Sequence, residues 1–199
     1  RDVLGSRGLG DVYKRQTENK GFKLNPVECS VGSIIRSVYK RFTTLVNQKG
    51  IELKVEIPEE ELLASVDKEA LTKILSNLFT NALKYAQTYA YLSLSVDEAG
   101  KEFTIVMSND GKIIPIEMRE NIFRPFVQYR DGKDIVPGTG IGLALARSLA
   151  ELHQGTLTMD QDMECNRFIL SIPIRHQTAS DVLEEEHREK PVYLSLIHI

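Results

Sequence analysis

A glycine-rich segment directly before a run of helix formers is the feature that most constrains this chain. Three glycines alternate within 137–143, Pro-Gly-Thr-Gly-Ile-Gly-Leu, and the helix formers of 144–152 follow without a break. Glycine lets the backbone approach a ligand closely, and a helix start offers unpaired N–H groups, which together suit phosphate. Alone, the pattern fits a tightly packed helix start equally well, because it has neither a following Lys-Ser/Thr pair nor the dinucleotide glycine spacing.

Composition excludes several function classes. The 199 residues carry a formal net charge of −3, and no basic stripe is interleaved with aromatics, which argues against nucleic acid as the main partner. No apolar run is long enough to span a membrane and no signal-peptide pattern is present, so we expect no membrane contact by this chain and a cytoplasmic location. Cys29 and Cys165 lack metal-ligand spacing and fit a reducing compartment.

The two ends of the chain are predicted to be foreign. The hexapeptide Asp-Val-Tyr-Lys-Arg-Gln at 11–16 can be encoded by DNA whose reverse complement encodes Leu-Ser-Leu-Ile-His-Ile, the sequence of 194–199. This pairing resembles a transposase adapter used in sequencing libraries, so 1–16 and 194–199 are left out of the fold prediction. We expect one domain over 17–176, a charged linker over 177–193, and a native protein that extends beyond both ends.

Helical spacing predicts two amphipathic helices in the first half. Ser30 is suited to cap the first, whose apolar residues recur at helical intervals until Gly50. Residues 17–29 are predicted to be irregular, whereas 51–57 alternate as a half-buried strand. Asp67 caps the second helix, whose apolar stripe contains Leu71, Ile74, Leu75, Leu78 and Ala82.

A polar flank runs along this second helix. At 100° per residue, Asn77, Asn81 and Lys84 lie on one side of the apolar stripe and Tyr85 lies near the other. Asparagine is a poor helix former because its amide competes for backbone partners. Two asparagines one turn apart beside a lysine therefore suggest a binding site, and a solvated flank is the alternative for these residues alone.

The second half predicts paired strands around the glycine helix. Alternating residues give a β-hairpin from 92–96 and 103–107, which ends in a polar turn at 108–111, and a last pair of strands over 157–159 and 168–174. Pro115 is expected to start a short helix through Asn121, a polar loop follows over 127–137, and Gly155 is expected to end the glycine helix. The predicted fold is α+β, a two-layer sandwich with helices on one face of the sheet.

Four short segments occur in an order that is highly specific for one protein family. They are Asn-Leu-Phe-Thr-Asn-Ala-Leu-Lys-Tyr at 77–85, Asn-Asp-Gly at 109–111 with Ile-Pro at 114–115, Phe-Arg-Pro-Phe at 123–126 and Gly-Thr-Gly-Ile-Gly-Leu at 138–143. They resemble the N box, first glycine box, F box and second glycine box of the ATP-binding catalytic domain of sensor histidine kinases. The resemblance extends from about Lys23 to Ile174. It implies the Bergerat (GHKL, HATPase_c) fold, with a mixed, mostly antiparallel sheet.

The resemblance also implies a site for ATP and Mg²⁺. Asn81, helped by Asn77, would supply amide oxygen to Mg²⁺, which keeps water and phosphate oxygens in the rest of its octahedral shell. Lys84 would neutralise phosphate charge and, with Asn77, would support phosphoryl transfer, and Tyr85 would lie along the nucleotide. The other implied nucleotide-binding residues are Asn109, Gly111, Ile114, Phe123, Gly138, Thr139, Gly140, Ile141, Gly142 and Leu143.

The resemblance also implies roles for residues in and beside the polar loop over 127–137. Phe123 and Phe126 would anchor the loop that follows them. Arg130 or Lys133 in that loop could reach the γ-phosphate or could be solvated charges.

Two positions depart from the family pattern. Asn109 stands where the family has the adenine-reading aspartate, and Ile113 stands where it has a glycine. An amide oxygen still accepts a hydrogen bond from the adenine amine. We therefore expect a variant pocket that binds ATP.

The implied reaction is donation of the γ-phosphate to a histidine on an upstream dimerisation domain, in two-component signalling. His153, His176, His187 and His198 lack a helix-borne His-Glu/Asp context, so the acceptor is expected outside this chain, which alone should not autophosphorylate. The implied partners are that domain, a response regulator or fused receiver domain, and a second copy in a homodimer. The intact protein could be anchored in a membrane with this domain on the cytoplasmic side.

Two alternatives remain from the sequence, and a third, the hydrolytic type, is disfavoured. Gyrase- and MutL-type relatives hydrolyse ATP with a glutamate where this chain has Asn77, and an amide cannot act as a general base. A serine/threonine kinase of anti-sigma-factor type has similar boxes. A degenerate nucleotide-binding scaffold would explain Asn109 and Ile113.

Overall fold

The computed structural model describes residues 23–128, 139–160 and 164–175. Its elements, in chain order, are β1 (Val27–Ser30), α2 (Val31–Lys49), β2 (Glu52–Glu56), β3 (Leu63–Val66), α3 (Lys68–Tyr85), β4 (Tyr89–Val96), β5 (Glu102–Asn109), α4 (Ile116–Arg119), the 3₁₀ turn η1 (Asn121–Phe123), α5 (Gly142–Leu152), β6 (Thr156–Met159) and β7 (Asn166–Pro173).

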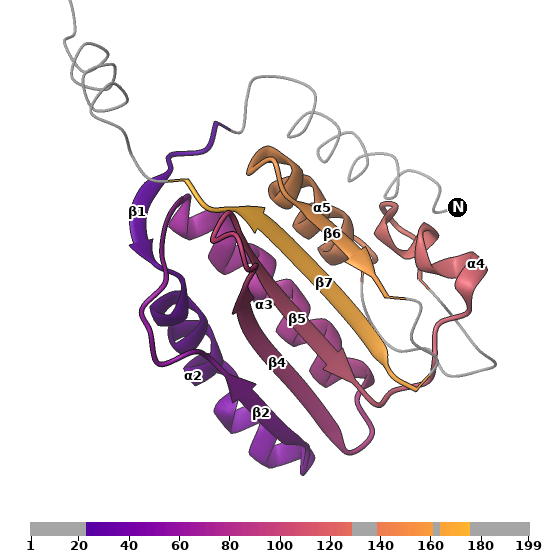
Figure 1. Cartoon of the computed structure of the whole chain (residues 1–199). Coiled ribbons are helices and arrows are strands. Elements are labelled where there is room, and N and C mark those ends of the chain that lie inside the picture. The colour runs from indigo at the N-terminus through magenta and orange to yellow at the C-terminus, as the bar shows by residue number, and fades with distance from the viewer. Residues whose placement is uncertain (1–22, 129–138, 161–163, 176–199) are drawn as a thin grey trace, which may run out of the picture.

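The fold has two layers, a sheet and the helices that cover one of its faces (Figure 1). The strand order of the five-stranded sheet is β2-β4-β5-β7-β6, with β2 parallel to β4 and the other neighbours antiparallel. The long helices α2, α3 and α5 lie on the same face. The predicted α+β sandwich with a mixed, mostly antiparallel sheet is confirmed.

The predicted caps hold the starts of the first two helices. The Ser30 hydroxyl accepts a hydrogen bond from the Ser33 N–H at 3.2 Å, and an Asp67 oxygen accepts from the Ala70 N–H at 2.9 Å. Gly50 ends α2 with φ of 65°, a left-handed conformation that glycine adopts without a Cβ penalty. Local sequence signals therefore set these boundaries.

A second, two-stranded sheet was not predicted. Strands β1 and β3 pair antiparallel, with Val27 opposite Val66, so the prediction of irregular structure is wrong for the last part of 17–29. The Ser65 N–H also donates to the Arg175 carbonyl at 2.8 Å. Each strand has four residues and finds its partner in a distant segment, so neither has a periodicity long enough to read.

The end of α5 also differs from the prediction. The helix is capped by His153, and Gln154 rather than Gly155 takes the left-handed conformation, with φ of 60°. Gly155 has a different requirement: a Cβ there would lie 2.2 Å from the Ser171 carbonyl oxygen of β7. His153, which caps the helix, is buried.

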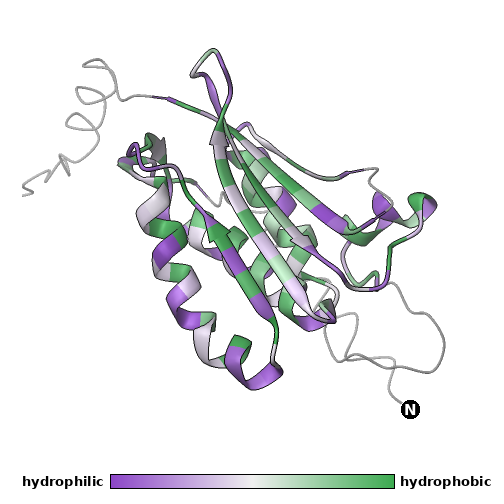
Figure 2. Ribbon diagram, turned by 60° about the horizontal axis from the view of Figure 1, so that its bottom comes forward, coloured by the Kyte–Doolittle hydropathy of each residue, from purple (hydrophilic) through white to green (hydrophobic). Residues whose placement is uncertain are grey.

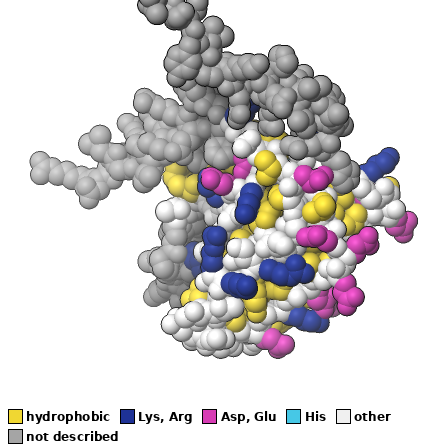
Figure 3. Space-filling view, turned by 90° about the vertical axis from the view of Figure 1, so that its left-hand side faces the viewer, with side chains coloured by type: hydrophobic (Ala, Val, Ile, Leu, Met, Phe, Trp, Pro, Cys, Tyr) yellow, Lys and Arg dark blue, Asp and Glu magenta, His cyan; other side chains and the backbone are white. Residues whose placement is uncertain are grey.

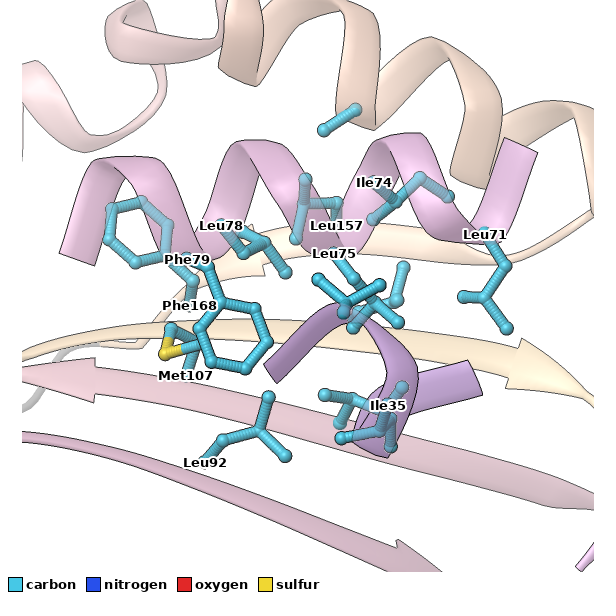
Figure 4. Close-up of a cluster of buried hydrophobic side chains, with 14 of the residues drawn as sticks. Ile35, Leu71, Ile74, Leu75, Leu78, Phe79, Leu92, Met107, Leu157 and Phe168 are labelled. Carbon is cyan, nitrogen blue, oxygen red and sulfur yellow. The ribbon is translucent and has the colours of Figure 1, made fainter. Parts of the chain in front are cut away.

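The core fills the space between the helices and the sheet. The apolar stripe of α3 faces apolar residues from three strands, as Figure 4 shows for Leu78, Leu92, Met107 and Phe168. Hydrophobic and hydrophilic residues alternate along α2 and the strands (Figure 2), because only one face of each is covered. Burying one such large side chain contributes about 1.5–3 kcal/mol, so α3 is the main link between the layers.

The side of the molecule that carries α2 and β2 has charged side chains with hydrophobic ones between them (Figure 3). Basic and acidic side chains are interspersed there (Figure 3). On β2, the Lys54 ammonium lies 2.6 Å from Glu56, but both side chains are at least half exposed, and such pairs add little stability. Among the described residues, no helix is both long and apolar enough to cross a membrane.

Candidate functional site

The predicted polar flank of α3 lies beside its buried stripe. Asn77, Asn81 and Lys84 are partly exposed, while Leu78 and Ala82 between them are buried. The Asn77 Nδ2 donates to the Lys73 carbonyl at 3.0 Å, which directs the amide oxygen away from the helix backbone. Within the described residues, the Asn81 side chain has no hydrogen bond. The flank therefore presents amide oxygen that the helix does not use.

The basic end of this flank carries a cation–π pair. The Lys84 ammonium lies 4.7 Å from the centre of the Tyr85 ring, a distance at which the ring quadrupole attracts a cation. Both predicted nucleotide-binding side chains are thus adjacent at the last turn of α3.

The glycine helix begins against the first asparagine of α3. A Cβ on Gly142 would lie 2.8 Å from the Asn77 Oδ1, so the two helices meet with no room for a side chain. The N-cap of α5, Ile141, makes no side-chain hydrogen bond, in contrast to the capped starts of α2 and α3. The first N–H groups of α5 thus emerge, without a side-chain acceptor, beside an amide oxygen of α3.

The glycine segment also contacts the F box through its backbone. The Phe126 N–H donates to the Gly140 carbonyl at 2.9 Å, and a Cβ on Gly140 would lie 2.9 Å from the Val127 carbonyl oxygen. Gly140 has φ of 70° and Phe126 has φ of 66°. Of the two phenylalanines expected to anchor this region, only Phe123 is buried; the Phe126 ring is 46% exposed and holds through its backbone.

Phe123 is fixed by an aromatic ring and a guanidinium. Its ring meets Phe168 edge-on at 6.3 Å, and the Arg147 guanidinium lies 4.4 Å from its centre. Arg147 also donates to Glu120 at 3.1 Å, and this hydrogen bond lowers the pKa of the Glu120 carboxyl. Sequence reasoning missed Arg147, because its position in the glycine helix showed no motif.

The first glycine box packs on the end of α3. A Cβ on Gly111 would lie 2.2 Å from the Tyr85 carbonyl oxygen and 2.6 Å from the Asn109 Nδ2. Asn109, placed in a polar turn by the prediction, is the last residue of β5 and only 1% exposed. Its Nδ2 is buried without a hydrogen-bond partner in the described part of the chain. A buried donor without a hydrogen bond costs free energy unless a ligand or a water accepts from it.

Asp110 ties this box to the residues after α3. Its carboxylate accepts from the Gln87 N–H at 2.9 Å and from the Thr88 N–H at 2.8 Å. Burial would raise the pKa of Asp110, but the hydrogen bond from the Thr88 hydroxyl and those from the backbone lower it. The Asp110 carboxylate therefore has a structural use here.

Two further residues hold the loop after Asn109, and sequence reasoning missed both. The Asn166 amide bonds with the backbone of Gly111, Lys112 and Ile114. The Arg119 Nε donates to the Ile114 carbonyl at 3.1 Å, although arginine is rarely buried and this one is 6% exposed. The Asn166 contacts join segments distant in sequence, so no local pattern signals them, whereas Arg119 lies only five positions from Ile114.

The four predicted boxes therefore meet around the C-terminal half of α3. The N box contacts the second glycine box through Asn77 and the first through Tyr85, and the F box contacts the second glycine box through Phe126. In the sequence, Thr139 precedes and Leu143 follows the glycines that make these contacts. Gly138, Arg130 and Lys133, together with three of the four histidines, lie outside the described residues.

Among the residues that the structure describes, no three His, Cys, Asp or Glu side chains gather as a metal site. The metal ligands implied by the resemblance are amide oxygens, which do not depend on such a cluster.

The fold and the meeting of these boxes define a nucleotide-binding ATPase architecture. Residues 66–176, more than half of the chain, match the family described as Histidine kinase-, DNA gyrase B-, and HSP90-like ATPase, and the chain belongs to this family. Within it, the similar proteins are sensor kinases, so the predicted histidine kinase ATPase domain of two-component sensors is confirmed.

Two curated relatives illustrate the similarity. The probable sensor kinase SilS of Salmonella typhimurium is 33% identical over 112 residues, which cover 56% of this chain and 22% of SilS. The sensor histidine kinase TmoS of Ectopseudomonas mendocina is 30% identical over 154 residues, which cover 76% of this chain and 15% of TmoS. This chain thus spans about a fifth of the length of these relatives.

Two solved structures share the fold. The nucleotide-free catalytic domain of histidine kinase ThkA superposes with a TM-score of 0.65 at 25% identity, covering 76% of this chain and 99% of that domain. Full-length ShkA in complex with AMPPNP superposes with a TM-score of 0.73 at 20% identity, covering 85% of this chain and 35% of ShkA.

Proposed function

We propose that this domain binds ATP with Mg²⁺ around the C-terminal half of α3 and donates the γ-phosphate to a histidine on a separate dimerisation domain. One observation carries the proposal: the start of α5 abuts the Asn77 amide oxygen so closely that a Cβ on Gly142 would lie 2.8 Å from it. Donors suited to phosphate and an acceptor suited to Mg²⁺ are thereby adjacent.

The residues present fit the metal. Mg²⁺ prefers oxygen ligands and retains several water and phosphate oxygens, so one or two protein oxygens are sufficient. Asn77 and Asn81 would provide them, since the Asn77 Nδ2 is already occupied by the Lys73 carbonyl and leaves its oxygen for the ion. Bound Mg²⁺ supplies charge neutralisation on the phosphates.

The residues present also fit the phosphates. The backbone from Thr139 to Leu143, preceded by Gly138, would surround the triphosphate at the uncapped start of α5, where the helix dipole favours negative charge. Gly140 keeps this backbone bare, because any side chain there would meet the F-box backbone. Lys84 would add a cation and Tyr85 an aromatic face.

The buried amide of Asn109 fits a purine base. Its Nδ2 is buried against Gly111, so its Oδ1 would be the atom that accepts a hydrogen bond from the amine of the base. Gly111, Ile114 and Phe123 would line the same region. The amide in place of a carboxylate is thus compatible with ATP.

The geometry favours transfer over hydrolysis. Phosphoryl transfer depends mostly on positioning and charge neutralisation, which the site provides. Asn77 occupies the helix position at which the hydrolytic relatives have a glutamate, and an amide cannot take a proton from water. We therefore propose slow hydrolysis, an acceptor histidine on an upstream domain of a homodimer, and a response regulator or receiver domain as the next acceptor.

The test is ATP binding by the 199-residue chain with and without Mg²⁺, measured by calorimetry, followed by transfer of labelled phosphate to a supplied histidine-bearing dimerisation domain. We expect Asn81→Ala to abolish the Mg²⁺-dependent part of binding, while Asn47→Ala, a matched exposed asparagine on α2, leaves it unchanged. Unaltered affinity in Asn81→Ala would refute the metal role. Binding without transfer would favour a scaffold, and labelling of a serine would favour the anti-sigma type.

A further inference from the structure

We propose that Asn166 is a positioning residue that sets the base selectivity of the nucleotide site. The inference rests on the proposed function and extends it to a residue outside the four boxes. Asn166 begins β7 and is 2% exposed.

The Asn166 amide uses both of its ends to hold one short loop. Its Oδ1 accepts from the Ile114 N–H at 2.9 Å, and its Nδ2 donates to the carbonyls of Lys112 at 2.8 Å and Gly111 at 3.2 Å. A single side chain thereby fixes the backbone of 111–114. Because β7 is a central strand of the sheet, the loop takes its position from the rigid layer of the fold.

A second side chain also holds this loop. The Arg119 Nε donates to the Ile114 carbonyl at 3.1 Å, and its Nη1 donates to the Asp160 carbonyl at 2.6 Å. Ile114 is therefore held at both its N–H, by Asn166, and its carbonyl, by Arg119.

The position of this loop determines how the Asn109 amide is presented. Asn109 and Asn166 face each other in the register of β5 and β7, and the Asn109 Nδ2 lies directly against Gly111. An amide has a donor end and an acceptor end of nearly the same shape. Packing by Gly111 on one end therefore decides which end turns toward a base, and a displaced loop would let the amide rotate.

Loss of Asn166 should affect recognition of the base and leave recognition of the triphosphate largely intact. The start of α5 is held by Gly140 against Phe126 and by Gly142 against Asn77, and Asn166 takes part in neither contact. A fixed acceptor at Asn109 discriminates a 6-amino purine from a 6-oxo purine, whereas a rotating amide serves both. Loss of Asn166 should thus reduce the preference for ATP over ITP more than it reduces binding of triphosphate.

The experiment compares Mg²⁺-ATP and Mg²⁺-ITP affinities of the 199-residue chain, by calorimetric titration, for the unaltered protein and Asn166→Asp. This substitution keeps the acceptor for Ile114 and removes both donors. We expect ATP affinity to fall about tenfold, as loss of two modest hydrogen bonds gives, while ITP affinity changes little. The ratio of the two affinities should therefore approach one.

The control is His153→Ala. His153 is a buried polar residue that joins α5 to the start of α3, so this variant should lose stability while it keeps the preference for ATP. If Asn166→Asp does not fold, Asn166→Ser should show the same reduced preference. An unchanged ratio in a folded Asn166 variant would overturn the inference alone. Failure of the unaltered chain to bind ATP would overturn the proposed function and the inference with it.

Discussion

The two ends of α3 differ in how their polar groups are partnered. At the N-terminal end, the Asp67 carboxylate accepts from the N–H groups of Ala70 at 2.9 Å and Asn25 at 2.8 Å, and the Asp67 N–H donates to the His153 Nε2 at 3.1 Å. At the C-terminal end, Asn81 has no hydrogen bond and the buried Asn109 Nδ2 has no partner, within the described residues.

This difference separates stability from function along one helix. A polar group that is buried and fully bonded fixes structure, whereas a buried group without a partner costs free energy and is retained where a ligand completes it. Asparagines in a helix likewise cost helix propensity. We infer that the first end of α3 serves the fold and the second end serves binding.

The largest effect on stability should come from adding a side chain at two glycines that each lie against a backbone carbonyl. A Cβ on either Gly111 or Gly155 would lie 2.2 Å from a backbone carbonyl oxygen, but Gly111 contacts Tyr85 near the proposed site and Gly155 contacts Ser171 away from it. Both alanine variants should lose roughly 1–3 kcal/mol of unfolding free energy. Only Gly111→Ala should also weaken ATP binding, by about tenfold or more.

Urea unfolding and ATP titration of both glycine variants, at a temperature at which both are folded, measure this difference. Equal losses of ATP affinity in the two variants would show that the ends of α3 are not separable.

Removing the cap at the first end should affect stability alone. Asp67→Ala deletes the acceptor for the N–H groups of Asn25, Ala70 and Glu69, and we expect a loss of about 1–2 kcal/mol of unfolding free energy. The affinity of the folded protein for ATP should stay as it is. Denaturant curves with a parallel nucleotide titration test this, and weakened binding at full folding would connect Asp67 to the site.

The same cap predicts how stability depends on pH. Burial would raise the pKa of Asp67, but hydrogen bonds from the N–H groups of Asn25, Ala70 and Glu69 outweigh it and lower the pKa. Because the folded-state pKa lies below the unfolded one, Asp67 contributes stability above its unfolded pKa of about 3.9, and this is lost as pH falls through the folded pKa.

Asp67→Asn should therefore flatten the acid limb of a plot of unfolding free energy against pH. The measurement is a set of urea curves between about pH 2 and pH 6, because this contribution is lost below the unfolded pKa. The Asp67→Asn curve should converge with that of the unaltered chain at the acid end; parallel curves throughout would contradict this role of the carboxylate.

The smallest effect should have the opposite sign. Asn81→Ala replaces a poor helix former by the best one at a partly exposed position, so we expect stability to rise by up to about 0.7 kcal/mol, while Mg²⁺-dependent ATP binding is lost. Thermal unfolding without nucleotide checks this. A destabilised variant would mean that Asn81 has a structural use.

Sequence reasoning succeeded where the signal was local. The caps Ser30 and Asp67, the spacing of α3 and the alternation of β4 and β5 depend on neighbouring residues, and the structure has them as predicted. It placed Asn109 in a turn, although the inward alternation of Phe103, Ile105 and Met107 continues to this residue and indicates its burial. That pattern was available and was not extended far enough.

The remaining features depend on contacts between distant segments. The β1–β3 pair joins strands of four residues that are separated by α2 and β2. Asn166 is 52 positions from the Ile114 that it holds, and Arg147 stacks on a ring in η1. Their roles exist only once the chain has folded. The four boxes identified which segments meet, but they did not identify the side chains that hold those segments in place.

The hydrogen bond from the Phe126 N–H to the Gly140 carbonyl joins the two ends of the segment between these residues, and this affects how much a change in its length costs. It brings the two flanks of the intervening segment together independently of what that segment contains. Each doubling in length of a flexible loop closed in this way costs only about 0.6 kcal/mol. We therefore expect a change in the number of residues between Phe126 and Gly140 to cost this fold little unfolding free energy.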